Sequence, residues 1–132
     1  MMSKIFQREM KHLEQELLTL SAIVEENVML AIRATQTRDR GLAEEIRQRD
    51  VDVDRREVEL EEECLKILAL HQPVAVDLRI LVASLKINND LERVGDLAVG
   101  ISRCAIELCA LPELPLPAGV MELAEAALEL FG

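Results

Sequence analysis

The chain has 132 residues, a length typical of one domain, and half of them are hydrophobic, which is enough to bury a core. Its formal net charge of −10 argues against direct nucleic-acid binding, because such binding depends on clustered lysine and arginine. Trp and Tyr are absent and only two Phe occur, so the core must be aliphatic, and the abundant Leu, Ala and Glu favour helix over strand.

The first predicted helix runs from an N-cap at Ser3 to Thr37. Seven positions in it alternate steps of three and four residues, the period of side chains that face a helical partner. They are Leu13, Leu17, Leu20, Val24, Asn27, Ala31 and Ala34. Asn27 is the one polar member of this row, and the segment around Asp39 and Gly41 predicts the first break.

The second predicted helix runs from Leu42 to Leu70 and carries two rows of the same period. One row is apolar and consists of Ile46, Val53, Leu60 and Ile67. The other row consists of Ala43, Asp50, Glu57 and Cys64. It therefore places two carboxylates at core positions, where an acid is costly unless it is paired or bound to a metal.

Pro73 predicts a tight turn after the second helix, because the residue before a proline resists the helical region. The third predicted helix then runs from Val74 to Leu111. Its inner row is apolar at both ends and polar or small in the middle. The row consists of Leu78, Leu81, Leu85, Asn88, Glu92, Gly95, Val99, Ser102, Ile106 and Cys109.

The remaining residues contain three prolines and then an apolar stripe at helical spacing from Val120 to Phe131. We therefore predict an all-α fold, a three-helix antiparallel bundle with the start of a fourth helix. The bundle covers residues 1–111, a proline-rich linker covers 112–118, and the further helix begins within 119–132.

Two groups of carboxylates are candidates for a metal site, since carboxylates suit hard cations. Glu92 and Asp96 are one helical turn apart, so their charges repel unless a cation joins them, and Asn88 on the same face could add a carbonyl oxygen. The second group consists of Asp50, Asp54 and Glu57. The alternatives are a solvated acidic face for the first group and arginine pairing for the second. The third helix offers a basic row for such pairing, made of Arg79, Lys86 and Arg93.

No catalytic pattern accompanies these acids, because a phosphate loop, a nucleophile elbow and a Cys/His pair are all missing from the sequence. We therefore do not expect an enzyme. Cys64, Cys104 and Cys109 are odd in number and lie among apolar helical residues, which predicts reduced core thiols and a cytoplasmic protein.

Residues 72–96 read QPVAVDLRILVASLKINNDLERVGD, which closely resembles the signature of the PhoU family of phosphate-signalling and phosphate-transport regulators. The family pattern is a QP-x-A-x-DLR turn and helix start, a lysine, and then DLERIGD or ELERIGD. Val94 in place of isoleucine is the only change in the last element. Asp50, Glu57, Glu62 and Cys64 also match the family pattern, and the resemblance covers roughly residues 5–131.

The resemblance implies a regulator that is not an enzyme and that links a phosphate transporter ATPase to a membrane sensor histidine kinase. Such a protein would reach the membrane only through its partners. Family members typically contain two tandem three-helix bundles, and in some members an E(D)-x-x-x-D motif in each bundle binds iron or other metal clusters. Glu92 and Asp96 are the copy in this chain, with Asp50 and Asp54 as further ligands and iron, zinc or another divalent or trivalent ion as the metal.

The chain stops where a second repeat would begin. We therefore expect either one half of a longer molecule or a homodimer that replaces the tandem repeat, and the apolar stripe at 120–131 argues against a bare monomer. The alternative function is a metal-binding or structural helical bundle without a phosphate role.

Overall fold

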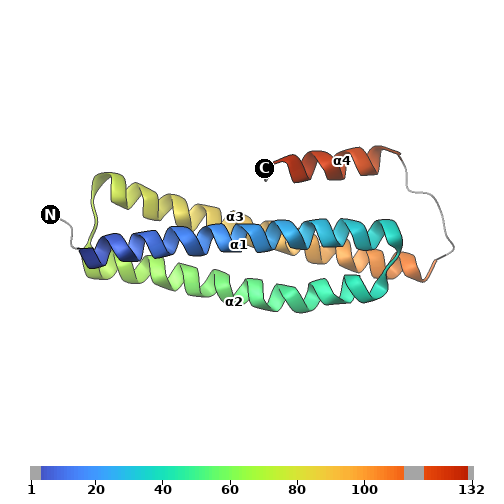
Figure 1. The fold of residues 1–132 in the computed structure, drawn as a ribbon, viewed down its shortest axis with the longest axis horizontal. Helices are drawn as coiled ribbons and strands as arrows, with labels where there is room; N and C mark the ends of the chain where they lie inside the picture. Colours follow the sequence, from blue (N-terminus) through green and yellow to red (C-terminus); the bar gives the residue numbers. More distant parts are fainter. Residues whose placement is uncertain (1–3, 112–117, 131–132) are drawn as a thin grey trace.

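The computed structural model describes residues 4–111 and 118–130, which form four helices and no strand (Figure 1). The helices are α1 (Lys4–Thr37), α2 (Arg40–His71), α3 (Ala75–Cys109) and α4 (Ala118–Glu129). Figure 1 shows α1, α2 and α3 side by side and antiparallel, with α4 on the outside of the bundle. The predicted three-helix bundle is confirmed, whereas the predicted N-cap at Ser3 and the linker prolines lie outside the described residues.

The two turns of the bundle follow from local chemistry. Asp39 caps α2, because its side chain accepts a hydrogen bond of 3.0 Å from the Leu42 amide. The helix therefore begins two residues earlier than predicted, and Gly41 lies in its first turn. At the other end Gln72 adopts a left-handed conformation with φ of 45°, and its amide donates to the Leu68 carbonyl.

The predicted inner rows of α1 and α2 are buried, apart from Leu17 and Asp50, which are half-buried. The largest hydrophobic cluster joins all three long helices. Its buried members are Phe6, Leu13, Leu20, Val24, Val53, Leu60, Cys64, Ile67, Leu81 and Leu91. Burial of each large aliphatic side chain stabilises the fold by roughly 1.5–3 kcal/mol.

The predicted inner row of α3 is wrong at every second position. The buried residues are Leu81, Ser84, Asn88, Leu91, Gly95, Ala98, Ser102 and Ala105. Leu91 thus takes the core position predicted for Glu92, which is exposed. Both rows have the same period, and the observed row offers smaller side chains such as Ala98, which let the helices approach closely. The larger Val99 stays half-buried at the flank.

The prediction of three core thiols holds only for Cys64. Cys64 is buried, and burial followed by the charges of Glu63 and Glu61 raises the pKa of its thiol to about 11. Cys104 is exposed, and Cys109 is half-buried with its thiol 3.0 Å from the Arg38 carbonyl oxygen. In the described helices, no segment is long and apolar enough to cross a membrane.

The short helix α4 covers only part of an apolar groove between α1 and α3. Leu128 packs on the cluster that contains Val28 and Ala98. A further cavity of about 560 Å³ continues along the groove between Ile87 and Leu130. Leu123 of α4 remains 72% exposed, so the predicted apolar stripe is only partly covered.

Candidate metal-binding face

The five predicted metal-ligating residues lie along the junction of α2 and α3, around Gly95. A Cβ placed on Gly95 would lie 3.5 Å from Asp50 Oδ1 and 3.9 Å from Glu57 Oε1. The absence of a side chain at Gly95 therefore leaves the space that the two α2 acids face. We define the acidic face as Asp50, Asp54, Glu57, Glu92 and Asp96.

The members of the acidic face differ in exposure. Glu57 is buried, with 7% of its surface exposed, and Asp50 is half-buried. The prediction that these two acids occupy inner positions of α2 is confirmed. Asp54, Glu92 and Asp96 are exposed, so they form the solvent side of the face.

Ionisation of the two inner acids is unfavourable. Burial, and after it the charges of Glu92, Asp54, Asp50 and Asp96, together raise the pKa of Glu57 to about 7. Burial, and after it the charges of Asp54 and Asp96, together raise the pKa of Asp50 to about 6. The acids of both helices therefore repel one another across the junction, and a cation placed among them would reverse the sign of this term.

Two buried oxygen atoms of this region have no hydrogen-bond partner. They are Glu57 Oε1 and Asn88 Oδ1. The Asn88 amide donates to the Glu57 backbone carbonyl at 2.9 Å, which holds the asparagine beside the acid. Buried acceptors without donors are uncommon because each loses its hydration without compensation, so both oxygens can still accept a hydrogen bond or ligate a cation.

The arginine-pairing alternative for the α2 acids is wrong for the acidic face. In the described part of the chain, no ion pair joins Asp50, Asp54 or Glu57 to a basic residue. The pairs of α2 involve its outer acids, since Arg55 and Arg56 both bind Asp52 and thereby lower the pKa of that carboxyl. The basic row of α3 is exposed.

The donor chemistry of the acidic face fits a hard cation, because it offers carboxylate and amide oxygens, an unpartnered buried oxygen and open space at Gly95. As the side chains stand, no three His, Cys, Asp or Glu groups of the described residues lie close enough together to hold one ion. Closure around a cation would therefore need new rotamers at the exposed members, such as Glu92 and Asp96.

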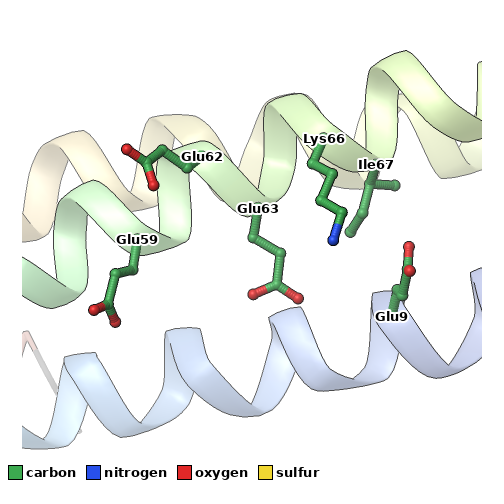
Figure 2. A pocket seen from close by; sticks show the side chains of 6 residues that line it. All are labelled: Glu9, Glu59, Glu62, Glu63, Lys66 and Ile67. Atoms are coloured by element: carbon green, nitrogen blue, oxygen red, sulfur yellow. The ribbon is translucent and has the colours of Figure 1, made fainter.

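A second acidic region lies where α2 faces α1, at residues for which the sequence predicts no site. A cavity of about 410 Å³ lies there between the two helices. In Figure 2, Glu63 and Lys66 point into it from α2 while Glu62 points away. The residues that line it are Glu9, Glu59, Glu62, Glu63, Lys66 and Ile67. Lys66 supplies a positive charge here that the acidic face lacks.

Two histidines connect α1 and α2 along this region. His71 Nε2 lies 2.9 Å from Glu9 Oε2, and its ring meets Phe6 edge-on at 5.1 Å. His12 Nε2 lies 3.7 Å from Glu63 Oε2. The only sequence signal was the spacing of three between Glu9 and His12, which does not identify partners on another helix. These contacts join the helices and account for both histidines structurally.

Comparisons with known proteins agree with the signature and the fold. The family model of the PhoU domain matches residues 17–105. The chain is 40% identical over 113 residues to the phosphate-specific transport system accessory protein PhoU homolog of Pseudomonas putida, covering 86% of this chain and 44% of that protein. It is 34% identical over 111 residues to the accessory protein PhoU of Escherichia coli strain K12, covering 84% and 46%.

Solved structures show the same architecture. The crystal structure of PhoU from Pseudomonas aeruginosa superposes with a TM-score of 0.91 at 35% identity, over 96% of this chain and 61% of that one. The chain spans about half the length of the curated relatives it matches. Because the family model matches about two thirds of the chain and the signature lies on the α2–α3 turn and the acidic face, the protein belongs to the PhoU family.

Proposed function

We propose that this protein regulates phosphate uptake and phosphate-responsive signalling as a non-catalytic adaptor between a phosphate transporter ATPase and a sensor histidine kinase. The match of the PhoU domain to residues 17–105 carries the proposal, together with relatives named as accessory proteins of a phosphate-specific transport system. A long acidic bundle is suited to docking on basic protein surfaces.

We further infer that the acidic face binds a divalent or trivalent cation such as iron or zinc. Glu57 and Asp50 would hold it from α2, and Glu92 and Asp96 from α3, with Asp54 at the rim. The unpartnered Glu57 Oε1, and the burial and repulsion that together raise the pKa of Glu57, support this assignment. A bound cation would supply positive charge that links α2 to α3 and would keep both inner acids ionised.

Metal analysis of the purified chain tests the acidic face. We expect metal after loading with iron, zinc or manganese, and loss of most of it in Glu92→Ala with helicity retained. Asp90→Ala is the matched control, because Asp90 is an exposed acid of the same helix that lines the α1–α3 groove instead. Equal loading of both variants would contradict the assignment, as would failure of the original chain to load.

The adaptor role is tested in cells grown in low and in high phosphate. We expect the tagged protein to co-purify with a phosphate transporter ATPase and a histidine kinase, with recovery that depends on the phosphate supply. Recovery of neither partner in either medium, with metal still bound, would favour the alternative of a metal-binding or structural bundle without a phosphate role.

We also infer a homodimer, because the groove beyond α4 is apolar and Leu123 is largely exposed. Light scattering at micromolar concentration should give twice the mass of the chain, and deletion of residues 118–132 should change that result. A monomeric mass unaffected by the deletion would contradict the dimer.

A further inference from the structure

The charges of this chain are segregated along the bundle. One end is built from residues 4–11 of α1 and residues 64–82, which hold the end of α2, the turn and the start of α3. Figure 1 shows these segments meeting at the same extremity, at the left of the view. They carry a net charge of +3 while the rest of the chain carries −13, since the whole chain has −10. We call this end the basic tip.

Four cations of the basic tip are available to a partner. They are Lys4, Arg8, Lys11 and Arg79, and all four are exposed. Within the described structure, no ion pair involves any of the four. Lys66, the fifth cation of the tip, points instead into the cavity lined by glutamates (Figure 2). Of the two acids at the tip, Glu9 is bound to His71 and Asp77 is half-buried.

The basic tip is also rich in exposed apolar side chains. It contains nine of the nineteen large hydrophobic residues that the described structure exposes, namely Ile5, Leu65, Leu68, Leu70, Val74, Val76, Leu78, Ile80 and Val82. Leu70, Val74 and Val76 flank the turn and are 63%, 69% and 63% exposed. Such a concentration of solvated apolar surface is typical of an interaction site.

The position of these side chains distinguishes between two kinds of anionic partner. An acidic amphipathic helix needs a groove for its apolar face. The turn between α2 and α3 lies at one end of the bundle (Figure 1), and Leu70, Val74 and Val76, which flank it, are exposed. An exposed apolar end that also carries cations matches the interface of an anionic bilayer, where apolar side chains enter the headgroup layer and lysine and arginine meet lipid phosphates.

We propose that the basic tip binds directly to the surface of an anionic lipid bilayer. The strongly acidic remainder of the chain is repelled by the same surface, so the bundle stands on the membrane with the tip toward the lipid and the acidic face away from it. This contact goes beyond the proposed function, and it departs from the sequence expectation that partners alone bring the protein to a membrane.

Vesicle flotation of the full chain tests the proposal. The probes are vesicles of phosphatidylcholine with 30% phosphatidylglycerol and vesicles of phosphatidylcholine alone, in low salt with a chelator to exclude bridging by metal ions. We expect binding to the anionic vesicles only, weakened by salt. The double variant Arg8→Glu/Arg79→Glu should lower the partition coefficient about tenfold or more, given the usual contribution of each cation near an anionic surface.

Matched variants separate the tip from net charge and general hydrophobicity. Arg33→Glu/Arg103→Glu makes the same charge change at exposed positions outside the tip and should retain most of the binding. Leu70→Ser/Val76→Ser should weaken binding severalfold, whereas Val51→Ser/Val58→Ser, also at exposed positions, should not. Circular dichroism verifies that each variant folds.

Three results would overturn the proposal. They are failure of the chain to bind anionic vesicles at low salt, equal binding to neutral vesicles, and equal losses in the tip and control variants. Binding of an acidic amphipathic peptide to the tip without vesicle binding would assign the surface to a protein partner instead. None of these results depends on metal loading or on co-purification of the transporter ATPase, so the proposed function is tested separately.

Discussion

Gly95 of α3 faces Asp50 of α2 so closely that an added Cβ would lie 3.5 Å from Asp50 Oδ1. This is ordinary van der Waals contact, so Gly95→Ala fits without a clash. The substitution should raise the free energy of unfolding of the metal-free protein by up to about 1 kcal/mol, through helix propensity. It should nevertheless lower metal loading, because the methyl group occupies the space that the inner acids face.

Gly100→Ala is the control for this substitution, because no atom lies within 4 Å of a Cβ at Gly100. It should give a similar gain in stability in urea denaturation and leave metal loading unchanged. If Gly95→Ala loads metal as well as Gly100→Ala does, then the open space at Gly95 has no role in the site.

The buried Glu57 carboxyl predicts a pH dependence of stability in the metal-free protein. Its pKa is raised from 4.5 to about 7, so between these values the folded chain keeps a proton that the unfolded chain releases. The resulting stability is complete below about pH 4.5 and is lost as the pH rises through about 7. The free energy of unfolding should therefore fall over this range, with a further contribution from Asp50.

Glu57→Gln removes that titration. At pH 8 the variant should be more stable than the original metal-free chain by roughly 1–2 kcal/mol, a discounted value because solvent screens part of the repulsion. At pH 4 the two should be nearly equal. Glu62→Gln, at an exposed position, serves as the control and should leave the pH profile unchanged. If the pH profile of Glu57→Gln equalled that of the original metal-free chain, Glu57 would ionise normally in the fold.

Arg49 satisfies the one polar side chain in the inner row of α1. Its Nε donates to Asn27 Oδ1 at 2.7 Å, and Asn27 is only 1% exposed. Arg49→Ala should cost about 1–3 kcal/mol of unfolding free energy in urea titration, because a buried acceptor loses its donor. Arg47→Ala, at an exposed site on the same helix, should change stability by less than about 0.5 kcal/mol. Equal effects would mean that the hydrogen bond contributes nothing.

Leu20 belongs to the largest hydrophobic cluster and is fully buried. Leu20→Ala should destabilise the bundle by about 2–5 kcal/mol, through lost burial and the cavity left behind. Leu18→Ala tests the assignment of the buried face, because Leu18 is 64% exposed and its truncation should cost less than about 0.5 kcal/mol. If thermal unfolding showed Leu18→Ala to be more destabilising than Leu20→Ala, the assignment of the buried face would be wrong.

Most of the fold could be predicted from the sequence, because the spacing of apolar residues along a helix and the residues that form a turn are local features of the chain. The inner row of α1 could be predicted, since its apolar positions repeat in steps of three and four with little competition from neighbouring rows. The α2–α3 turn could be predicted from Pro73. On α3 two rows of equal period compete, and the sequence does not say which of Leu91 and Glu92 packs inward.

For the candidate site, too, the sequence determined one part and the packing of the helices determined the other. The sequence by itself determined that this chain forms a three-helix bundle with the family signature, and that Asp50 and Glu57 occupy inner positions of their helix. The tertiary structure decided that Glu92 lies on the solvent side, that Gly95 opens the space opposite Asp50, and that the cations of distant segments gather at one tip. These outcomes depend on how helices pack against one another, and a one-dimensional period cannot encode the distance between side chains on different helices.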